Sequence, residues 1–112
     1  MNIQETFDTL IENEQIRKAI EFVKDDHENS LKEHKEFILC ESPTFHEKER
    51  ALMYAGKLKE NGIEDVLIDE YVNVHGYRKG TGNGPTILIE AHMDTVFPFG
   101  SVKGRGISGV SV

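Results

Sequence analysis

The spacing of hydrophobic residues changes near Asn61-Gly62, and this change limits the folds that the chain can adopt. Before it, apolar residues recur three and four positions apart, as on an amphipathic helix, at Ile16, Ala19, Ile20 and Val23. After it, they gather in short runs that are typical of strands, at 65–69, 72–77 and 86–91. Helices followed by strands of this kind predict an α/β fold, with helices packed on a mixed sheet.

Capping patterns predict where the first helices begin. One helix is expected to begin near Asn13, after a short helical turn at 7–11. Ser30 with Glu33 is a capping-box pattern, so a second helix is expected from residue 31 onward. The apolar stripe continues across 23–31, which also allows one long helix in place of two.

A third helix is predicted over about 45–60. The preceding helix should end at Ser42-Pro43, because the residue before proline avoids the helical region. Thr44 with Glu47 is a second capping-box pattern. Glycine after Asn61 supplies a left-handed helix stop. The inward-facing positions are expected to be Ala51, Leu52, Ala55 and Leu58. The almost continuous apolar run at 86–91 predicts a strand buried on both faces.

Composition and charge narrow the functional classes. The chain has 112 residues, is 38% hydrophobic and 29% charged, and carries a net charge of −7, as expected for one globular domain. Residues 1–70 hold 18 acidic and 9 basic residues, and this acidic part disfavours a nucleic-acid partner. No apolar run is long enough to span a membrane, and no secretory signal is visible. With Cys40 as its one cysteine, the chain is expected to be cytoplasmic.

The strongest chemical signal is His92-Met93-Asp94, at the end of the predicted buried strand. Residues two apart on a strand share a face, so the Asp94 carboxylate can approach the His92 imidazole and fix its tautomer. A neutral histidine held in this way is a good zinc ligand. The spacing alone also allows a structural role, in which His92 caps the strand and Asp94 bonds backbone amides of the next turn.

Other polar residues give weaker signals. His46 and Glu47 begin an H-E-x-x-R pattern, a near miss of the zincin helix in which Arg50 cannot bind a metal cation. His75 is expected to have a surface or cross-strand role. Glu90 could reach the His92 site or form an ion pair instead.

Three segments together resemble the co-catalytic zinc peptidases and deacylases. The stretch 84–98 is similar to their first metal-binding motif, an apolar strand followed by His-x-Asp. The stretch 42–51 resembles their S-P-[ST]-x-x-E-x-x-x-A helix start, and 68–76 their D-x-x-G-N-V strand pair, with Val72 in place of the glycine. The family includes acetylornithine deacetylase, succinyl-diaminopimelate desuccinylase, aminoacylase, carboxypeptidase G and the tripeptide aminopeptidases. The resemblance covers roughly residues 14–100.

The resemblance implies the N-terminal portion of a three-layer α/β/α zinc-peptidase catalytic domain. His92 stands where the family has a ligand to one of two zinc ions, and Asp94 where it has the carboxylate that orients this ligand. Co²⁺ or Mn²⁺ could replace zinc. The implied substrate of the full-length parent is a peptide or an N-acyl amino acid, hydrolysed by water activated at the metal ions.

The later ligands and the general base of that family have no counterpart here. Residues 95–112 contain no Asp, Glu, His or Cys, so 1–112 is expected to be a partial catalytic domain, inactive alone. Its stretch 99–112 is expected to be a flexible or divergent tail. The alternative is a non-catalytic folding, assembly or binding fragment that holds no metal. An unpaired strand at 86–91 would then favour self-association.

Overall fold

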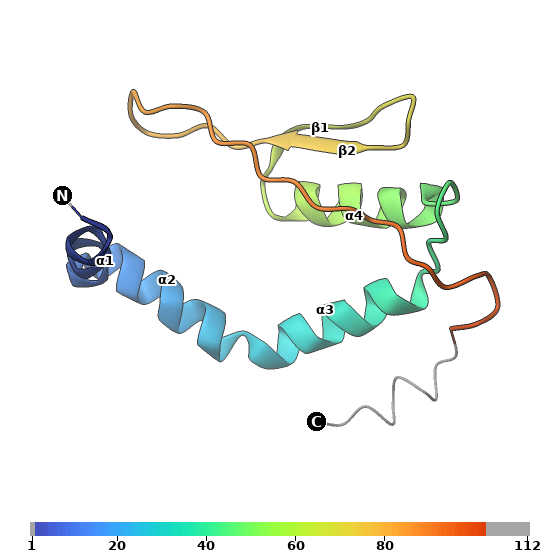
Figure 1. The fold of residues 1–112 in the computed structure, drawn as a ribbon, viewed down its shortest axis with the longest axis horizontal. Coiled ribbons are helices and arrows are strands. Elements are labelled where there is room, and N and C mark those ends of the chain that lie inside the picture. Colours follow the sequence, from blue (N-terminus) through green and yellow to red (C-terminus); the bar gives the residue numbers. More distant parts are fainter. Residues whose placement is uncertain (1, 103–112) are drawn as a thin grey trace. The chain divides into compact units, whose positions relative to one another are not determined.

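The computed structural model describes residues 2–102, which form four helices and one two-stranded antiparallel sheet (Figure 1). The helices are α1 (Ile3–Glu12), α2 (Glu14–Asp25), α3 (His27–Leu39) and α4 (Lys48–Glu60). Strands β1 (Glu64–Ile68) and β2 (Val74–Tyr77) follow them. This order confirms the predicted α/β class. The chain divides into two compact units, residues 1–35 and 36–112, and positions 103–112 of the predicted tail lie outside the described residues.

Asparagine caps begin α1 and α2 in the first unit. The Asn2 side chain accepts a hydrogen bond from the Glu5 amide at 2.8 Å, and the Glu5 carboxylate accepts one from the Asn2 amide at 3.2 Å. This capping box starts a ten-residue α1 where only a short turn was predicted. Asn13 caps α2 by accepting from the amides of Gln15 and Ile16, which confirms the predicted start near Asn13.

Helices α2 and α3 are separated only by Asp26, so the predicted start of a helix after Ser30 is wrong. The Ser30 amide already donates to the Asp26 carbonyl at 2.9 Å, as in a helix under way. Because the helix is already under way at Ser30, no unpaired backbone amide is left there for the Ser30 side chain to cap. The continuous apolar stripe, which allowed one long helix, describes this region better than the capping pattern does.

The second unit is built on α4, which contacts both strands of the β1–β2 hairpin. Ala51 and Ala55 are its buried positions, whereas Leu52 is 51% exposed, so the inward orientation predicted for Leu52 is wrong. Gly62 has φ +76 and ends the helix as predicted. The strands pair antiparallel, with Ile68 opposite Val74. These two alanines are the only buried hydrophobic side chains among the described residues, so the core is thin.

The second predicted capping box is also wrong. Helix α4 begins only at Lys48, and its cap residue Glu47 makes no side-chain hydrogen bond to the helix. The Glu47 carboxylate instead accepts from the Phe45 amide at 2.8 Å. The Thr44 hydroxyl donates to Asp94, far along the chain. The Thr44 side chain, which the local pattern assigned to the helix end, therefore makes a tertiary contact instead.

The apolar run at 86–91 forms no strand, contrary to the prediction (Figure 1). Ile87, Leu88 and Ile89 are 79%, 83% and 89% exposed. No backbone hydrogen bond joins this run to another segment of the described residues. Among the described residues, the sheet contains only β1 and β2, and the run pairs with neither strand.

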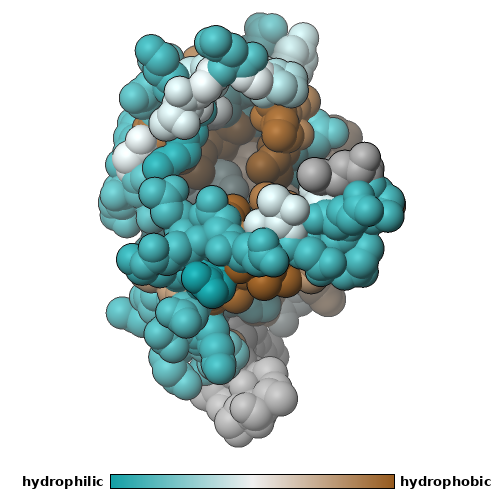
Figure 2. Space-filling model, turned by 90° about the vertical axis from the view of Figure 1, so that its left-hand side faces the viewer, coloured by the Kyte–Doolittle hydropathy of each residue, from teal (hydrophilic) through white to brown (hydrophobic). Residues whose placement is uncertain are grey.

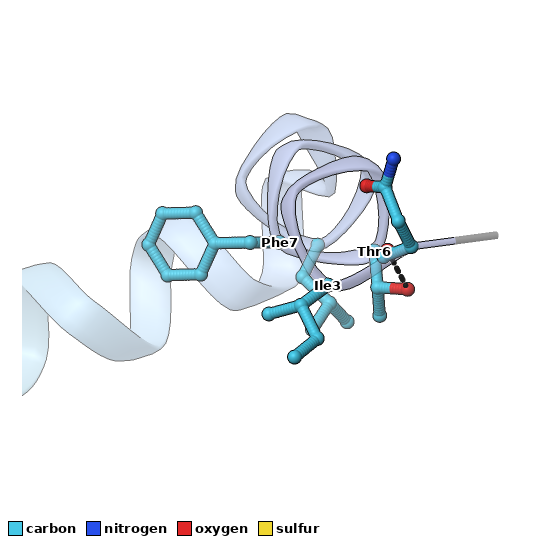
Figure 3. A pocket seen from close by; sticks show the side chains of 5 residues that line it. Ile3, Thr6 and Phe7 are labelled. Carbon is cyan, nitrogen blue, oxygen red and sulfur yellow. Dashed lines mark hydrogen bonds between the residues drawn. The ribbon is translucent and has the colours of Figure 1, made fainter.

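Apolar side chains also lie open on the first unit, among them Ile3, Ile20 and Phe22. In the view of Figure 2, brown hydrophobic groups stand exposed among teal hydrophilic ones. Two shallow apolar grooves follow the helix faces. The groove on α1 is lined by Ile3, Phe7 and Leu10 with Asn2 and Thr6 (Figure 3), and the groove on α2 by Ile16, Ala19, Ile20 and Val23. The Thr6 hydroxyl donates its proton to the Asn2 carbonyl at 3.0 Å. Within residues 2–102, every helix is too short or too polar to cross a bilayer.

Candidate functional site

The candidate site forms where the chain before α4 meets the chain after the extended run. The Thr95 amide donates to the Ser42 carbonyl at 2.8 Å, and Pro43 and Thr95 form an isolated parallel bridge. Ser42 itself is fully buried. These backbone contacts hold the His92–Asp94 segment beside residues 42–44, which belong to another of the three family-like segments.

His92 and Asp94 lie together as the spacing predicts. The His92 Nδ1 atom lies 3.0 Å from Asp94 Oδ1 and 3.0 Å from the Asp94 backbone carbonyl. A carbonyl can only accept a hydrogen bond, so the proton of the neutral ring belongs on Nδ1. The unprotonated Nε2 atom is then left with its lone pair, and the imidazole is 85% exposed. The contact that was predicted from a strand therefore exists without one.

Thr44 completes the surroundings of the Asp94 carboxylate. Its hydroxyl donates to Asp94 Oδ2 at 2.6 Å, the short distance typical of a hydroxyl bound to a charged acceptor. This hydrogen bond, more than the contact with His92, holds the pKa of Asp94 below its usual value, although partial desolvation opposes it. Asp94 is therefore ionised at neutral pH and acts only as an acceptor toward the imidazole.

Arg50 binds the backbone on both sides of the site. Its guanidinium donates to the carbonyls of Phe37 and Cys40 at the end of α3, with distances of 2.7–3.0 Å. It also donates to the Met93 carbonyl at 2.9 Å, between the two candidate site residues. Arg50 thus caps one helix and anchors the segment that carries His92. Sequence reasoning dismissed Arg50 as a non-ligand and missed this role, although the residue lies within the quoted 42–51 stretch.

The remaining candidates lie elsewhere. His46 is exposed, with its ring centroid 5.5 Å from that of Phe99. His75 binds Asp69 with 2.8 Å between Nε2 and Oδ2, which agrees with the cross-strand role predicted for it. Glu90 is exposed on the unpaired run.

The donor set of the site supplies part of what a zinc ion needs. His92 offers an accessible nitrogen lone pair with a supporting carboxylate, which suits one ligand position. Within residues 2–102, no three His, Cys, Asp or Glu side chains gather closely enough to hold a metal ion. The described residues therefore fit one ligand with its support, whereas a catalytic zinc takes about three protein ligands.

Comparison with known proteins gives one informative match. The chain is 39% identical over 72 residues to a protein from Pyrococcus abyssi (strain GE5 / Orsay), named "putative LysW-lysine/LysW-ornithine hydrolase". The relative is a hydrolase. The match covers 64% of this chain but only 20% of the relative, so this chain corresponds to about a fifth of that protein. It supports a hydrolase relationship at a coarse level. No model of a known protein family and no solved structure matches the chain.

Proposed function

We propose that this chain is part of a zinc-dependent hydrolase of peptide or N-acyl amide bonds, to which it contributes one metal ligand. His92 would hold the ion through Nε2, and Asp94 would orient His92. The observation that carries the proposal is the pair of acceptors on Nδ1, which leaves Nε2 as the free donor atom. The similarity to a hydrolase and the family-like segments around His92 support the same assignment.

The chain's own residues would prepare the ligand. Asp94 keeps the ring proton on Nδ1, Arg50 holds the intervening backbone, and the ring stays accessible. A bound zinc ion supplies Lewis acidity to polarise an amide carbonyl and to activate water. The remaining ligands and the general base would come from outside residues 2–102, so the chain alone is expected to be inactive. Its substrate would be a peptide or an N-acyl amino acid.

A zinc titration of the metal-free chain tests this assignment. Zn²⁺ should shift the imidazole nitrogen signals of His92 before those of His27 and His34, because Asp94 holds the His92 ring proton on Nδ1 and leaves the lone pair on the exposed Nε2. His92→Ala should remove the first binding event, while His27→Ala should leave it in place. Zinc that binds the His92→Ala chain as well as it binds the original would refute the role of His92.

A second candidate is a folding or assembly fragment that holds no metal. The observation in its favour is the exposed apolar run at 87–89, which needs a partner to become buried. The same titration separates the two functions. An absence of any shift at His92 at millimolar Zn²⁺, together with self-association of the chain, would favour the assembly fragment.

A further inference from the structure

Three side chains of the candidate site form one continuous chain of hydrogen bonds. Thr44 Oγ1 lies 2.6 Å from Asp94 Oδ2, and Asp94 Oδ1 lies 3.0 Å from His92 Nδ1. Thr44 and Asp94 are separated by 50 positions in the sequence. The carboxylate thus uses one oxygen for the hydroxyl and the other for the ring.

The direction of each hydrogen bond follows from chemistry. An ionised carboxylate can only accept, so the Thr44 hydroxyl must donate and the ring must donate from Nδ1. Rotation of an aspartate carboxylate about its Cβ–Cγ bond has only weak intrinsic preferences. The Asp94 side chain is 34% exposed, so without an anchor it could turn its oxygens to water. The Thr44 hydroxyl opposes that rotation.

We infer that Thr44 is a positioning residue for His92, acting through Asp94. By fixing the carboxylate, Thr44 adds to the preference for the Nδ1–H tautomer that the Asp94 backbone carbonyl also supports, and the Nε2 lone pair stays directed to a ligand. The use of this lone pair for a metal ion rests on the function proposed above. The tautomer itself does not, because it can be measured in the metal-free chain.

Backbone contacts make this role separable from folding. The Thr95 amide is bonded to the Ser42 carbonyl, and Arg50 is bonded to the Met93 carbonyl. Neither contact uses the Thr44 side chain. Thr44→Val, which keeps the shape and removes the hydroxyl, should therefore leave the segment in place.

The test is the tautomer of His92, read from the imidazole ¹⁵N shifts of the full chain without metal, at a pH where the ring is neutral. Free neutral histidine side chains favour the Nε2–H form, so a dominant Nδ1–H form at His92 is a positive signature. Thr44→Val should lower the Nδ1–H fraction at His92, and Thr44→Ser should retain it. Thr81→Val, at an exposed loop position, is the matched control and should change nothing. His75 binds Asp69 through Nε2 and serves as an internal reference of the opposite tautomer.

The outcomes distinguish the two proposals. An unchanged tautomer in Thr44→Val, or a loss that Thr44→Ser fails to prevent, would overturn the positioning role. A tautomer that changes as expected, with no Zn²⁺ effect at His92, would keep that role and refute the metal ligand. If both proposals hold, Thr44→Val should weaken Zn²⁺ binding at His92 by about tenfold, as loss of an outer-shell partner does at metal sites.

Discussion

The Asp69 carboxylate and the His75 imidazole lie 2.8 Å apart across the β1–β2 hairpin. The other oxygen of Asp69 accepts from the amides of Tyr71 and Asn73, both at 2.9 Å. One side chain therefore organises the turn and joins it to the second strand. The hydrogen bond from His75, assisted by those from the turn, lowers the pKa of Asp69 to about 2, against a usual value of 3.8.

The hairpin should consequently lose stability in acid. A lowered pKa means that the ionised form is favoured in the folded state, so its contribution is complete above about pH 4 and disappears as the pH falls toward 2. The Asp69 carboxyl ¹³C shift should titrate with a midpoint near that lower value. Hairpin amide shifts should change over the same range in the original chain but not in Asp69→Asn. Glu70→Gln is the neighbouring control, and an acid transition that persists in Asp69→Asn would contradict the prediction.

Val72 should be replaceable by glycine with a gain in stability. It has φ +68, a conformation that costs an L-residue roughly 1–2 kcal/mol and is rare for a β-branched side chain. Glycine removes that cost but loses more conformational entropy on folding, so a net gain of about 0.5–1 kcal/mol is expected for Val72→Gly. Urea unfolding measures the change. Val74→Gly, within β2, should instead destabilise the chain, and equal losses from both variants would contradict the explanation.

Gly76 should not tolerate a side chain. A Cβ atom at this position would lie 2.5 Å from Cγ2 of Ile63, a branch that cannot move far from its backbone. Gly76→Ala should therefore lower the free energy of unfolding by about 1–3 kcal/mol through overpacking. Gly80→Ala, where a Cβ would meet nothing within 4 Å, is the matched control. Thermal unfolding of both variants checks the prediction, which fails if Gly76→Ala unfolds no earlier than the control.

Arg50 should resist replacement by lysine. Its planar guanidinium donates hydrogen bonds to three carbonyls at once, those of Phe37, Cys40 and Met93. A lysine ammonium cannot reach the same three carbonyls. Arg50→Lys is expected to cost about 2 kcal/mol of stability, since hydrogen bonds to charged groups are worth more than neutral ones. Arg17→Lys, on exposed α2, should change stability little. Faster hydrogen exchange at 93–95 in Arg50→Lys would show that the His92 segment has loosened, and unchanged exchange would argue against the anchor.

The sequence predicted what depends on local spacing. Periodicity and the Asn13 cap placed the start of α2, and the His-x-Asp pattern placed the His92–Asp94 contact. Two errors occurred where a side chain binds a residue far away in the sequence. Thr44 matched a helix cap but binds Asp94, 50 positions away, and Arg50 binds Met93, 43 positions away. Neither partner could be chosen from spacing alone, because many sequence-distant acceptors were equally available.

The strand predicted at 86–91 illustrates the same limit. A strand needs a neighbour for its backbone, and hydrophobicity reports only that the segment prefers to be buried. The run remains unpaired, with Ile87, Leu88 and Ile89 almost fully exposed. The hydrophobic pattern therefore identified a segment that needs a partner without identifying the partner.

We expect that run to bring two copies of the chain together. An unpaired apolar segment can act as a template for strand pairing, and the sequence of this one is nearly symmetric about Leu88. In an antiparallel pair centred there, Ile87 would lie opposite Ile89 of the second copy, and Glu90 opposite Thr86. A parallel pair in register would place the two Glu90 carboxylates side by side, which is unfavourable.

Light scattering should therefore show self-association that increases with concentration, and a hydrophobic dye should bind the dissociated chain. Leu88→Lys should raise the dissociation constant at least tenfold by placing two like charges at the centre of the pair. Leu52→Lys introduces the same change on the exposed face of α4 and is the control. A monodisperse monomer that binds no dye would contradict the prediction. Only Leu88 lies at the centre of the antiparallel strand pair, so Leu88→Lys should weaken self-association more than Leu52→Lys does. Equal weakening by the two variants would show that the association depends on general hydrophobicity and not on this strand pair.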